Sequence, residues 1–196
     1  MLHALLPKDN TFNMLSYSHG TSSDHSLFSE GFSLKGLNIN LEYKANSAAS
    51  LKKIKKQHLI ISTGPELVSQ QLRKILEELA PTEVEFFDAK ISFGDVTLHD
   101  YSAINILHKR PCCNMGKSEY EITNFDPNSP VYMFLYTVLK DSMPENLNIA
   151  RCSEQPTLII INNKLKEHCL DKKLNNISFC SEIDITHKDR SICETV

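Results

Sequence analysis

The chain has 196 residues, of which 41% are hydrophobic and 23% are charged, and its formal net charge is −3. This composition is typical of a globular protein with one domain, or one domain and a small lobe, and it excludes disorder over most of the length. The acidic balance implies no basic face for nucleic acid, and no stretch reaches the roughly 18–20 apolar residues that span a bilayer.

Residues 1–50 are predicted to form a small N-terminal lobe that is partly loop. Residues 16–31 are rich in Ser, Gly and His and show weak periodicity. Apolar residues then recur over residues 32–43, which favours one or two short strands. The polar connector at residues 45–56 marks the boundary between this lobe and the main domain.

The main domain is predicted to open with a strand and a helix. Residues 58–62 (HLIIS) form an apolar run of strand length. Thr63 precedes Glu66 by three residues, the spacing of a capping box in which Thr63 accepts a hydrogen bond from the amide of Glu66. An apolar stripe at helical spacing follows and ends before Pro81, which predicts a helix beginning after Thr63. The stripe consists of Val68, Leu72, Ile75, Leu76 and Leu79.

More strands and a second helix follow. Residues 96–107 alternate loosely and predict one strand, and residues 131–139 (VYMFLYTVL) suit a buried strand, with a helix as the alternative. Asn162 or Asn163 is predicted to cap a helix that carries Leu165, His168 and Cys169 on one face. Further strands are predicted at residues 83–87, 146–151, 158–161 and 177–180.

These elements predict an α+β fold. The expected core is a mixed, largely antiparallel sheet with two main amphipathic helices packed on it. The main domain is assigned to residues 51–183. Residues 184–196 are a polar C-terminal tail that we expect to fray.

The six cysteines are expected to be reduced, because the start of the chain, MLHALLPKDN, lacks the basic segment of a signal peptide and predicts a cytoplasmic protein. Cys169 and Cys180 lie among apolar residues and are predicted to be core thiols. The adjacent pair Cys112 and Cys113 has a strained spacing for a disulfide. No C-x-x-C pair indicates a zinc ribbon or a thioredoxin-type site.

Two patterns around residue 115 were tested as chemical motifs. Gly116-Lys117-Ser118 resembles the end of a phosphate-binding loop, but Pro111 stands where that loop needs a glycine. Cys112 and Cys113 follow two basic residues that would favour a thiolate, yet no paired base is identified. A semi-buried loop thiol is therefore the favoured interpretation.

A metal site formed by His168, Cys169 and Cys152 is also disfavoured. Adjacent helical residues point about 100° apart and chelate one ion poorly. The sequence thus predicts no catalytic residue, no cofactor and no metal site.

Three segments in a fixed order carry a family resemblance. A strand leads into ELVSQQLRKILEEL and EVEFFDAKI, then YSAINIL leads into CCNMGKSEYEI, and finally MPENLNIARCSEQPTLIIINNKLKEHCLDKKLNNISFC follows. Over residues 32–183 this order resembles a family of bacterial immunity proteins from polymorphic toxin and type VI secretion systems. The chain departs from the family at Cys112, Cys113 and Asn114, where members usually carry acidic residues. The resemblance implies a cytoplasmic inhibitor, encoded beside a secreted toxin, that protects the producing cell by binding the toxin.

We therefore predict a non-enzymatic immunity protein whose partner is a cognate toxin. Such a protein needs a rigid scaffold and a complementary surface rather than catalytic residues. Loops commonly carry recognition, so polar and aromatic residues around the middle strands are the predicted toxin contacts. These are Asp95, Asp100, Tyr101, Glu119 and Tyr120. A small enzyme that uses a cysteine or a carboxylate and an adaptor unrelated to toxins are the alternatives.

Overall fold

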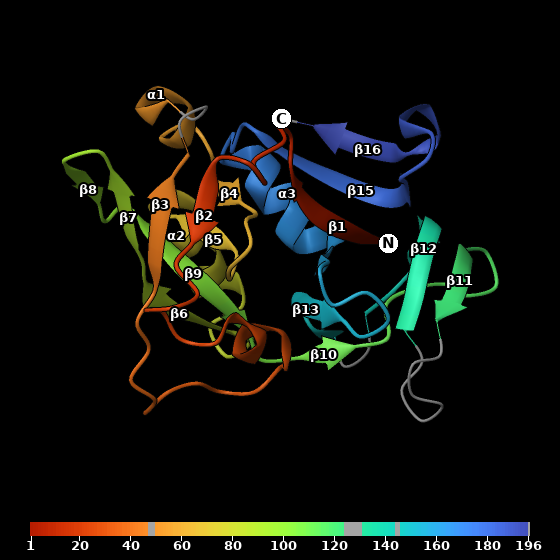
Figure 1. Ribbon diagram of the computed structural model, residues 1–196. Coiled ribbons are helices and arrows are strands. Elements are labelled where there is room, and N and C mark those ends of the chain that lie inside the picture. The colour runs from red at the N-terminus through yellow and green to blue at the C-terminus, as the bar shows by residue number, and fades with distance from the viewer. Residues whose placement is uncertain (47–49, 124–130, 144–145, 196) are drawn as a thin grey trace.

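The computed structural model describes residues 1–46, 50–123, 131–143 and 146–195 and is rich in β-sheet (Figure 1). Its largest sheet, here called the main sheet, has the strand order β10-β13-β14-β1-β15-β12-β11. Strand β16 lies off this path and also pairs with β15. In chain order its strands are β1 (Leu2–Pro7), β10 (Lys109–Arg110), β11 (Glu119–Thr123), β12 (Val131–Val138), β13 (Ile149–Cys152), β14 (Ile159–Asn162), β15 (Ile177–Asp184) and β16 (Ile192–Thr195).

Two four-stranded sheets make up the other half of the molecule. The outer sheet has the order β2-β3-β7-β8 and the middle sheet the order β4-β5-β9-β6. The outer strands are β2 (Leu15–Tyr17), β3 (Glu42–Ala45), β7 (Lys90–Phe93) and β8 (Val96–Leu98). The middle strands are β4 (Leu59–Ile60), β5 (Leu67–Ser69), β6 (Val84–Asp88) and β9 (Tyr101–Ile106). The strands of the predicted mixed, largely antiparallel sheet are thus divided among three sheets, with parallel pairing at β3–β7 and β10–β13.

Helices α2 (Gln70–Leu79) and α3 (Asn163–Asp171) lie between the middle and main sheets. Their apolar faces share one core cluster with residues such as Leu72, Ile104, Leu165 and Phe179. A second cluster fills the space between the outer and middle sheets, and a third covers the opposite face of the main sheet. The remaining helical elements are α1 (Leu51–Ile54) and the 3-10 turns η1 (His25–Ser29) and η3 (Lys188–Arg190).

The predicted capping box at Thr63 and Glu66 is wrong. Leu67 and Val68 pair with Ile60 and Leu59 in the middle sheet, so the chain is still extended there. The cap of α2 is Ser69, whose side chain accepts a hydrogen bond from the Leu72 amide. The prediction for α3 is confirmed, since Asn162 caps it by accepting from the Leu165 amide.

Two strand predictions also need correction, and one strand was not predicted. Residues 96–107 form two strands in different sheets, because the chain turns at His99 and Asp100 between β8 and β9. Residues 32–41, all of them described, contain no strand; Leu34 and Leu41 instead pack as loop residues into the core. Strand β1, which falls in the predicted N-terminal lobe, pairs with β14 and β15 in the main sheet.

The C-terminal tail contains a strand in its described part. Strand β16 pairs antiparallel with β15, and a disulfide joins Cys180 of β15 to Cys193 of β16. Cys180 is therefore not the reduced core thiol that we expected, because strand pairing brings Cys193 directly opposite it. Among the described residues, no helix has both the length and the apolar character needed to cross a membrane.

Candidate partner-binding surface

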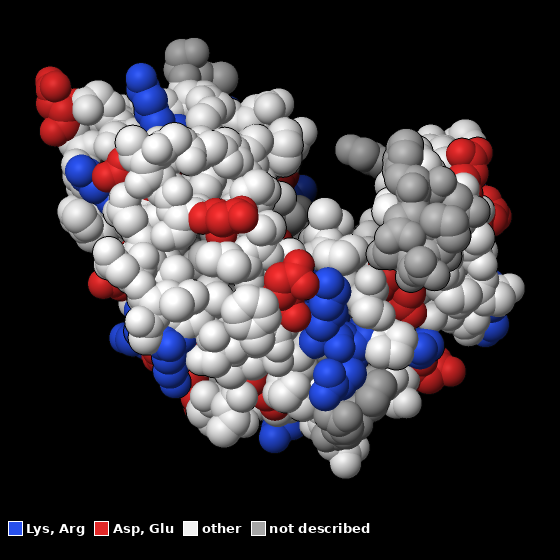
Figure 2. All heavy atoms as spheres, turned by 60° about the horizontal axis from the view of Figure 1, so that its bottom comes forward, with Lys and Arg blue, Asp and Glu red and all other residues white. Residues whose placement is uncertain are grey.

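Charged side chains are mixed on the molecular surface. In Figure 2, basic side chains lie at several separate places, the largest group of them lies beside acidic side chains, and uncharged residues cover most of that face. The described residues on this face form no continuous basic stripe of the kind that tracks a nucleic-acid backbone.

The cysteines do not form an accessible nucleophile. Cys112 and Cys113 are fully buried, so the semi-buried loop thiol of the sequence interpretation is wrong. Hydrogen bonding to Cys152 and burial raise the pKa of Cys112 and of Cys113, whereas the same hydrogen bonds lower the pKa of Cys152. Cys152 is 0% exposed as well, so none of these three thiols is within reach of a substrate.

The hairpin of β11 and β12 stands at one end of the main sheet, on the far right of Figure 1. Its register pairs Glu119 with Tyr136 at one end and Thr123 with Val131 at the other. Only residues Tyr136–Val138 of β12 pair with β15, so the outer part of the hairpin extends beyond the sheet. Strand β11 is an edge strand in the part of the chain that the structure describes.

The two faces of this hairpin differ in their contacts. On the inner face, Tyr120, Tyr132 and Phe134 form an aromatic cluster with ring centroids 5.4–6.1 Å apart, which packs on the third core cluster. Side chains alternate along a strand, so Val131, Met133 and Leu135 point the other way. They are 51%, 55% and 37% exposed. The aromatic cluster fixes the strand, and the opposite apolar face remains open to solvent.

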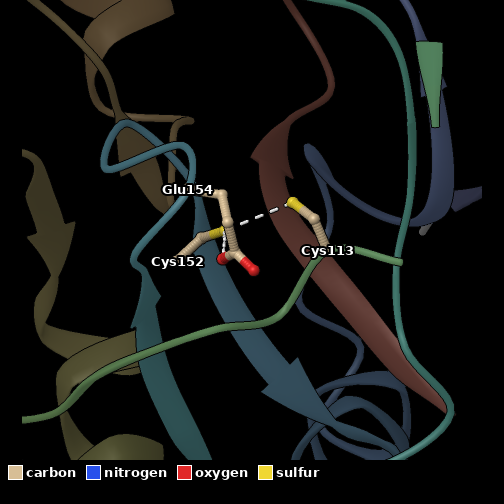
Figure 3. Close-up of side chains that lie close together, drawn as sticks. All are labelled: Cys113, Cys152 and Glu154. Carbon is tan, nitrogen blue, oxygen red and sulfur yellow. Dashed lines mark hydrogen bonds between the residues drawn. The ribbon is translucent and has the colours of Figure 1, made fainter. Parts of the chain in front are cut away.

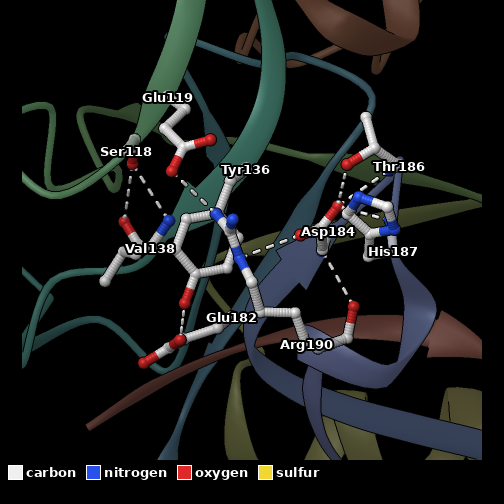
Figure 4. Close-up of polar contacts among 10 residues, drawn as sticks. Ser118, Glu119, Tyr136, Val138, Glu182, Asp184, Thr186, His187 and Arg190 are labelled. Carbon is white, nitrogen blue, oxygen red and sulfur yellow. Dashed lines mark hydrogen bonds and ion pairs between the residues drawn. The ribbon is translucent and has the colours of Figure 1, made fainter.

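A cationic clamp holds the inner end of the hairpin (Figure 4). The Arg190 guanidinium stacks on the Tyr136 ring, 3.7 Å from its centroid, and Arg190 Nη2 lies 2.9 Å from Glu119 Oε1. Arg190 Nε also contacts Asp184 Oδ2 at 2.9 Å. Hydrogen bonds from the Thr186 hydroxyl and from the amides of Thr186 and His187 lower the pKa of Asp184, so it stays ionised beside the arginine.

Ser118 closes the base of the same hairpin. Its hydroxyl accepts a hydrogen bond from the Val138 amide and donates to the Asn114 carbonyl, both at 2.9 Å. Gly116-Lys117-Ser118 thus leads into β11 and not into the helix that a phosphate-binding loop requires.

The five predicted contact residues are not brought together. Glu119 and Tyr120 lie on β11, whereas Asp95 lies in the turn between β7 and β8 at the other end of the molecule (Figure 1). Asp100 is exposed just before β9. Tyr101 is only 3% exposed and donates to the carbonyls of Ile54 and Gln57, so its side chain serves the core.

The sequence interpretation missed the exposed apolar residues of the hairpin. It treated residues 131–139 as a buried strand, but only Phe134, Thr137 and Leu139 in this stretch are buried. Both faces of VYMFLYTVL are apolar, so no hydrophobic alternation marks the face that is open.

Comparison with known proteins identifies a family to which the chain is similar. A search of curated proteins yields no match. A family model described as "Immunity protein family (Imm11)" matches residues 25–182, most of the chain, including both strands of the hairpin. The resemblance identified in the sequence is therefore confirmed, and the chain belongs to the Imm11 immunity protein family.

Proposed function

We propose that this chain is a non-enzymatic immunity protein that binds and neutralises a cognate secreted antibacterial toxin, using the outer face of the β11–β12 hairpin. It would act in the cytoplasm of the producing cell, within a polymorphic toxin or type VI secretion system. Family membership supports the class of function. The exposed row of Val131, Met133 and Leu135 is the observation that carries the choice of surface.

The apolar character of this surface supports a protein partner. Exposed apolar residues are normal when scattered singly, but a contiguous patch marks an interaction site. Ile185 adjoins the row of three because its amide donates to the Leu135 carbonyl, and its side chain is also exposed. Methionine at the centre of such a patch adapts its shape to a partner.

The edge of β11 and the nearby charges suit the same role. An open edge presents unpaired backbone groups to which a partner strand can be added. Glu121 lies opposite Met133 in the hairpin, and Glu119 is exposed close by. These carboxylates would complement basic residues around a toxin surface and guide its approach.

Co-expression tests the function directly. Cells that express the toxin encoded beside this gene should grow only when this protein is also present, and the two proteins should co-purify. Continued growth arrest, with both proteins folded and present, would contradict the immunity role. Rescue without physical association would point instead to enzymatic reversal of the toxin's damage.

A further inference from the structure

Two buried cysteines and a partly exposed glutamate, all of them metal-ligating residue types, lie close together (Figure 3), and one of them, Cys113, forms a bridge with Leu139 just after β12. Cys113 comes from the loop before β11, Cys152 ends β13, and Glu154 lies in the turn that follows. One ligand atom from each lies within 4.8 Å of those of the other two. The side chains point toward one another, and the proposed toxin contact uses none of them.

The spacing of the group fits a tetrahedral cation. The Sγ atoms of Cys113 and Cys152 are 3.4 Å apart, and Glu154 Oε2 is 3.3 Å from Cys152 Sγ. Around tetrahedral zinc, two sulfur ligands lie ~3.8 Å apart, and a sulfur and an oxygen ligand ~3.6 Å apart. Movements of a few tenths of an ångström would bring these two separations to those of zinc ligands, and the ligand atoms of Cys113 and Glu154 already lie within 4.8 Å of each other.

We propose that Cys113, Cys152 and Glu154 bind one Zn²⁺ ion. These three side chains leave the fourth position of the tetrahedron to a water molecule. Sulfur ligands disfavour Mg²⁺ and Ca²⁺, and zinc accepts mixed sulfur and carboxylate sets. On binding, each cysteine ligand loses its thiol proton to solvent as the Zn–S bond forms. Glu154 is partly exposed and provides the entry side, while the sulfur atoms lie inside the core.

The position of the site gives it a structural role. The Asn114 amide donates to the Val138 carbonyl at 2.7 Å, and the Lys140 amide donates to the Cys112 carbonyl at 2.9 Å. The end of β12 is therefore tied to the loop that carries Cys112 and Cys113. A bound ion would fix this loop to the end of β13 and so hold the base of the β11–β12 hairpin.

Metal content and spectroscopy of the full chain test the site without any toxin. The reduced protein, purified without chelator, should contain one zinc ion per chain. Replacement by Co²⁺ should give the visible bands of a tetrahedral ion and a sulfur-to-cobalt charge-transfer band. Cys152→Ser and Cys113→Ser should weaken binding by at least about 100-fold, because even second-shell changes cost 10–100-fold.

Matched variants separate ligand loss from misfolding. Cys169→Ser removes another buried free thiol, from α3, and should retain the metal. Glu154→Gln is a partly exposed change that should weaken binding even if the cysteine variants fail to fold. No metal in the folded, reduced wild type, or an equal loss in Cys169→Ser, would overturn the proposal. Isolation of a Cys113–Cys152 disulfide in place of bound zinc would also overturn it.

Discussion

Arg190 stacks on Tyr136 at 3.7 Å and so joins η3, near the C-terminus, to β12 of the hairpin. The same guanidinium contacts Glu119 on β11 and Asp184 on β15. The Arg190 side chain thus ties three strands together at the inner end of the hairpin. These contacts do not involve Val131, Met133 or Leu135, the residues of the exposed apolar face.

Arg190→Ala should destabilise the protein and loosen the hairpin. Loss of the cation–π contact alone removes ~0.5–1 kcal/mol from the free energy of unfolding at a partly exposed site. Arg190→Lys retains the charge but not the planar stacking and should recover only part of the loss. Urea unfolding measures both variants. Full recovery with lysine would show that charge, not stacking, dominates.

Stability should fall in acid partly through Asp184. Its pKa in the folded protein is below the ordinary aspartate value of 3.8, so its contribution to stability is present above that value and is lost as the pH falls through the folded pKa. Asp184→Asn should therefore have a shallower decline of unfolding free energy in this range than the wild type. Parallel curves for the two proteins would contradict this assignment.

Removing the disulfide should release β16. Cys180 and Cys193 are separated by 13 residues, and closing a loop of this size stabilises a protein by about 3 kcal/mol in the chain-entropy model. Serine at both positions should lower the free energy of unfolding by up to that amount and speed amide exchange in residues 192–195. Serine at Cys169, a free thiol, is the control for cysteine replacement.

The redox state of Cys180 and Cys193 indicates the compartment in which the protein acts. A cytoplasmic protein would keep these thiols reduced, whereas an oxidising compartment would join them. If the proposed cytoplasmic location is correct, alkylation in intact cells, followed by mass spectrometry, should find Cys180 and Cys193 as free thiols. A disulfide trapped in cells would contradict that location.

Glu66→Ala should be among the most destabilising single changes. Arg151 is 2% exposed and forms two hydrogen bonds with Glu66, of 2.7 and 2.9 Å, between the main sheet and the start of β5. Removing the carboxylate leaves a buried cation without its partner, at a cost of about 3–5 kcal/mol. Glu77→Ala breaks the solvent-accessible Arg73–Glu77 pair and should cost only about 0.3–0.5 kcal/mol. Similar losses of unfolding free energy in the two variants would contradict the expected difference between the buried and the solvent-accessible ion pair.

Local sequence patterns predicted several strands and both long helices, because their signals lie within a few residues. The strands around residues 60, 86, 160 and 178 and the Asn162 cap are examples. The true cap of α2 was missed because Leu67 and Val68 are held extended by pairing with β4 and β9. Strand β9 begins over 30 residues later in the chain, so no local pattern indicates this pairing.

The surface and the cysteine group depend on still longer-range contacts. Glu119 and Tyr120, two of the predicted contact residues, fall on the hairpin, but its exposed face is defined by packing of the opposite face on the core. Cys113 and Cys152 are 39 residues apart and carry no metal-binding spacing. Only the fold makes them neighbours.

Asp95 and Asp100, two of the predicted contact residues, define an alternative toxin-binding surface away from the hairpin. Asp95→Ala and Asp100→Ala should leave toxin affinity unchanged, because both residues lie far from the hairpin (Figure 1). A loss of roughly 1 kcal/mol or more of binding free energy in either variant, the threshold for an important interface residue, would instead place the toxin-binding surface at the β7–β8 end.

Toxin affinity of two matched valine variants tests most directly whether the exposed face of the β11–β12 hairpin binds the toxin. Val131 on the hairpin and Val96 on β8 have similar exposure, 51% and 48%, and both lie on strands. Each is changed to glutamate, and binding to the cognate toxin is measured by calorimetry with both proteins folded. The account predicts that Val131→Glu weakens binding at least about tenfold, equivalent to roughly 1.4 kcal/mol, while Val96→Glu binds like the wild type. Equal affinities for the two variants, or a loss confined to Val96→Glu, would contradict it.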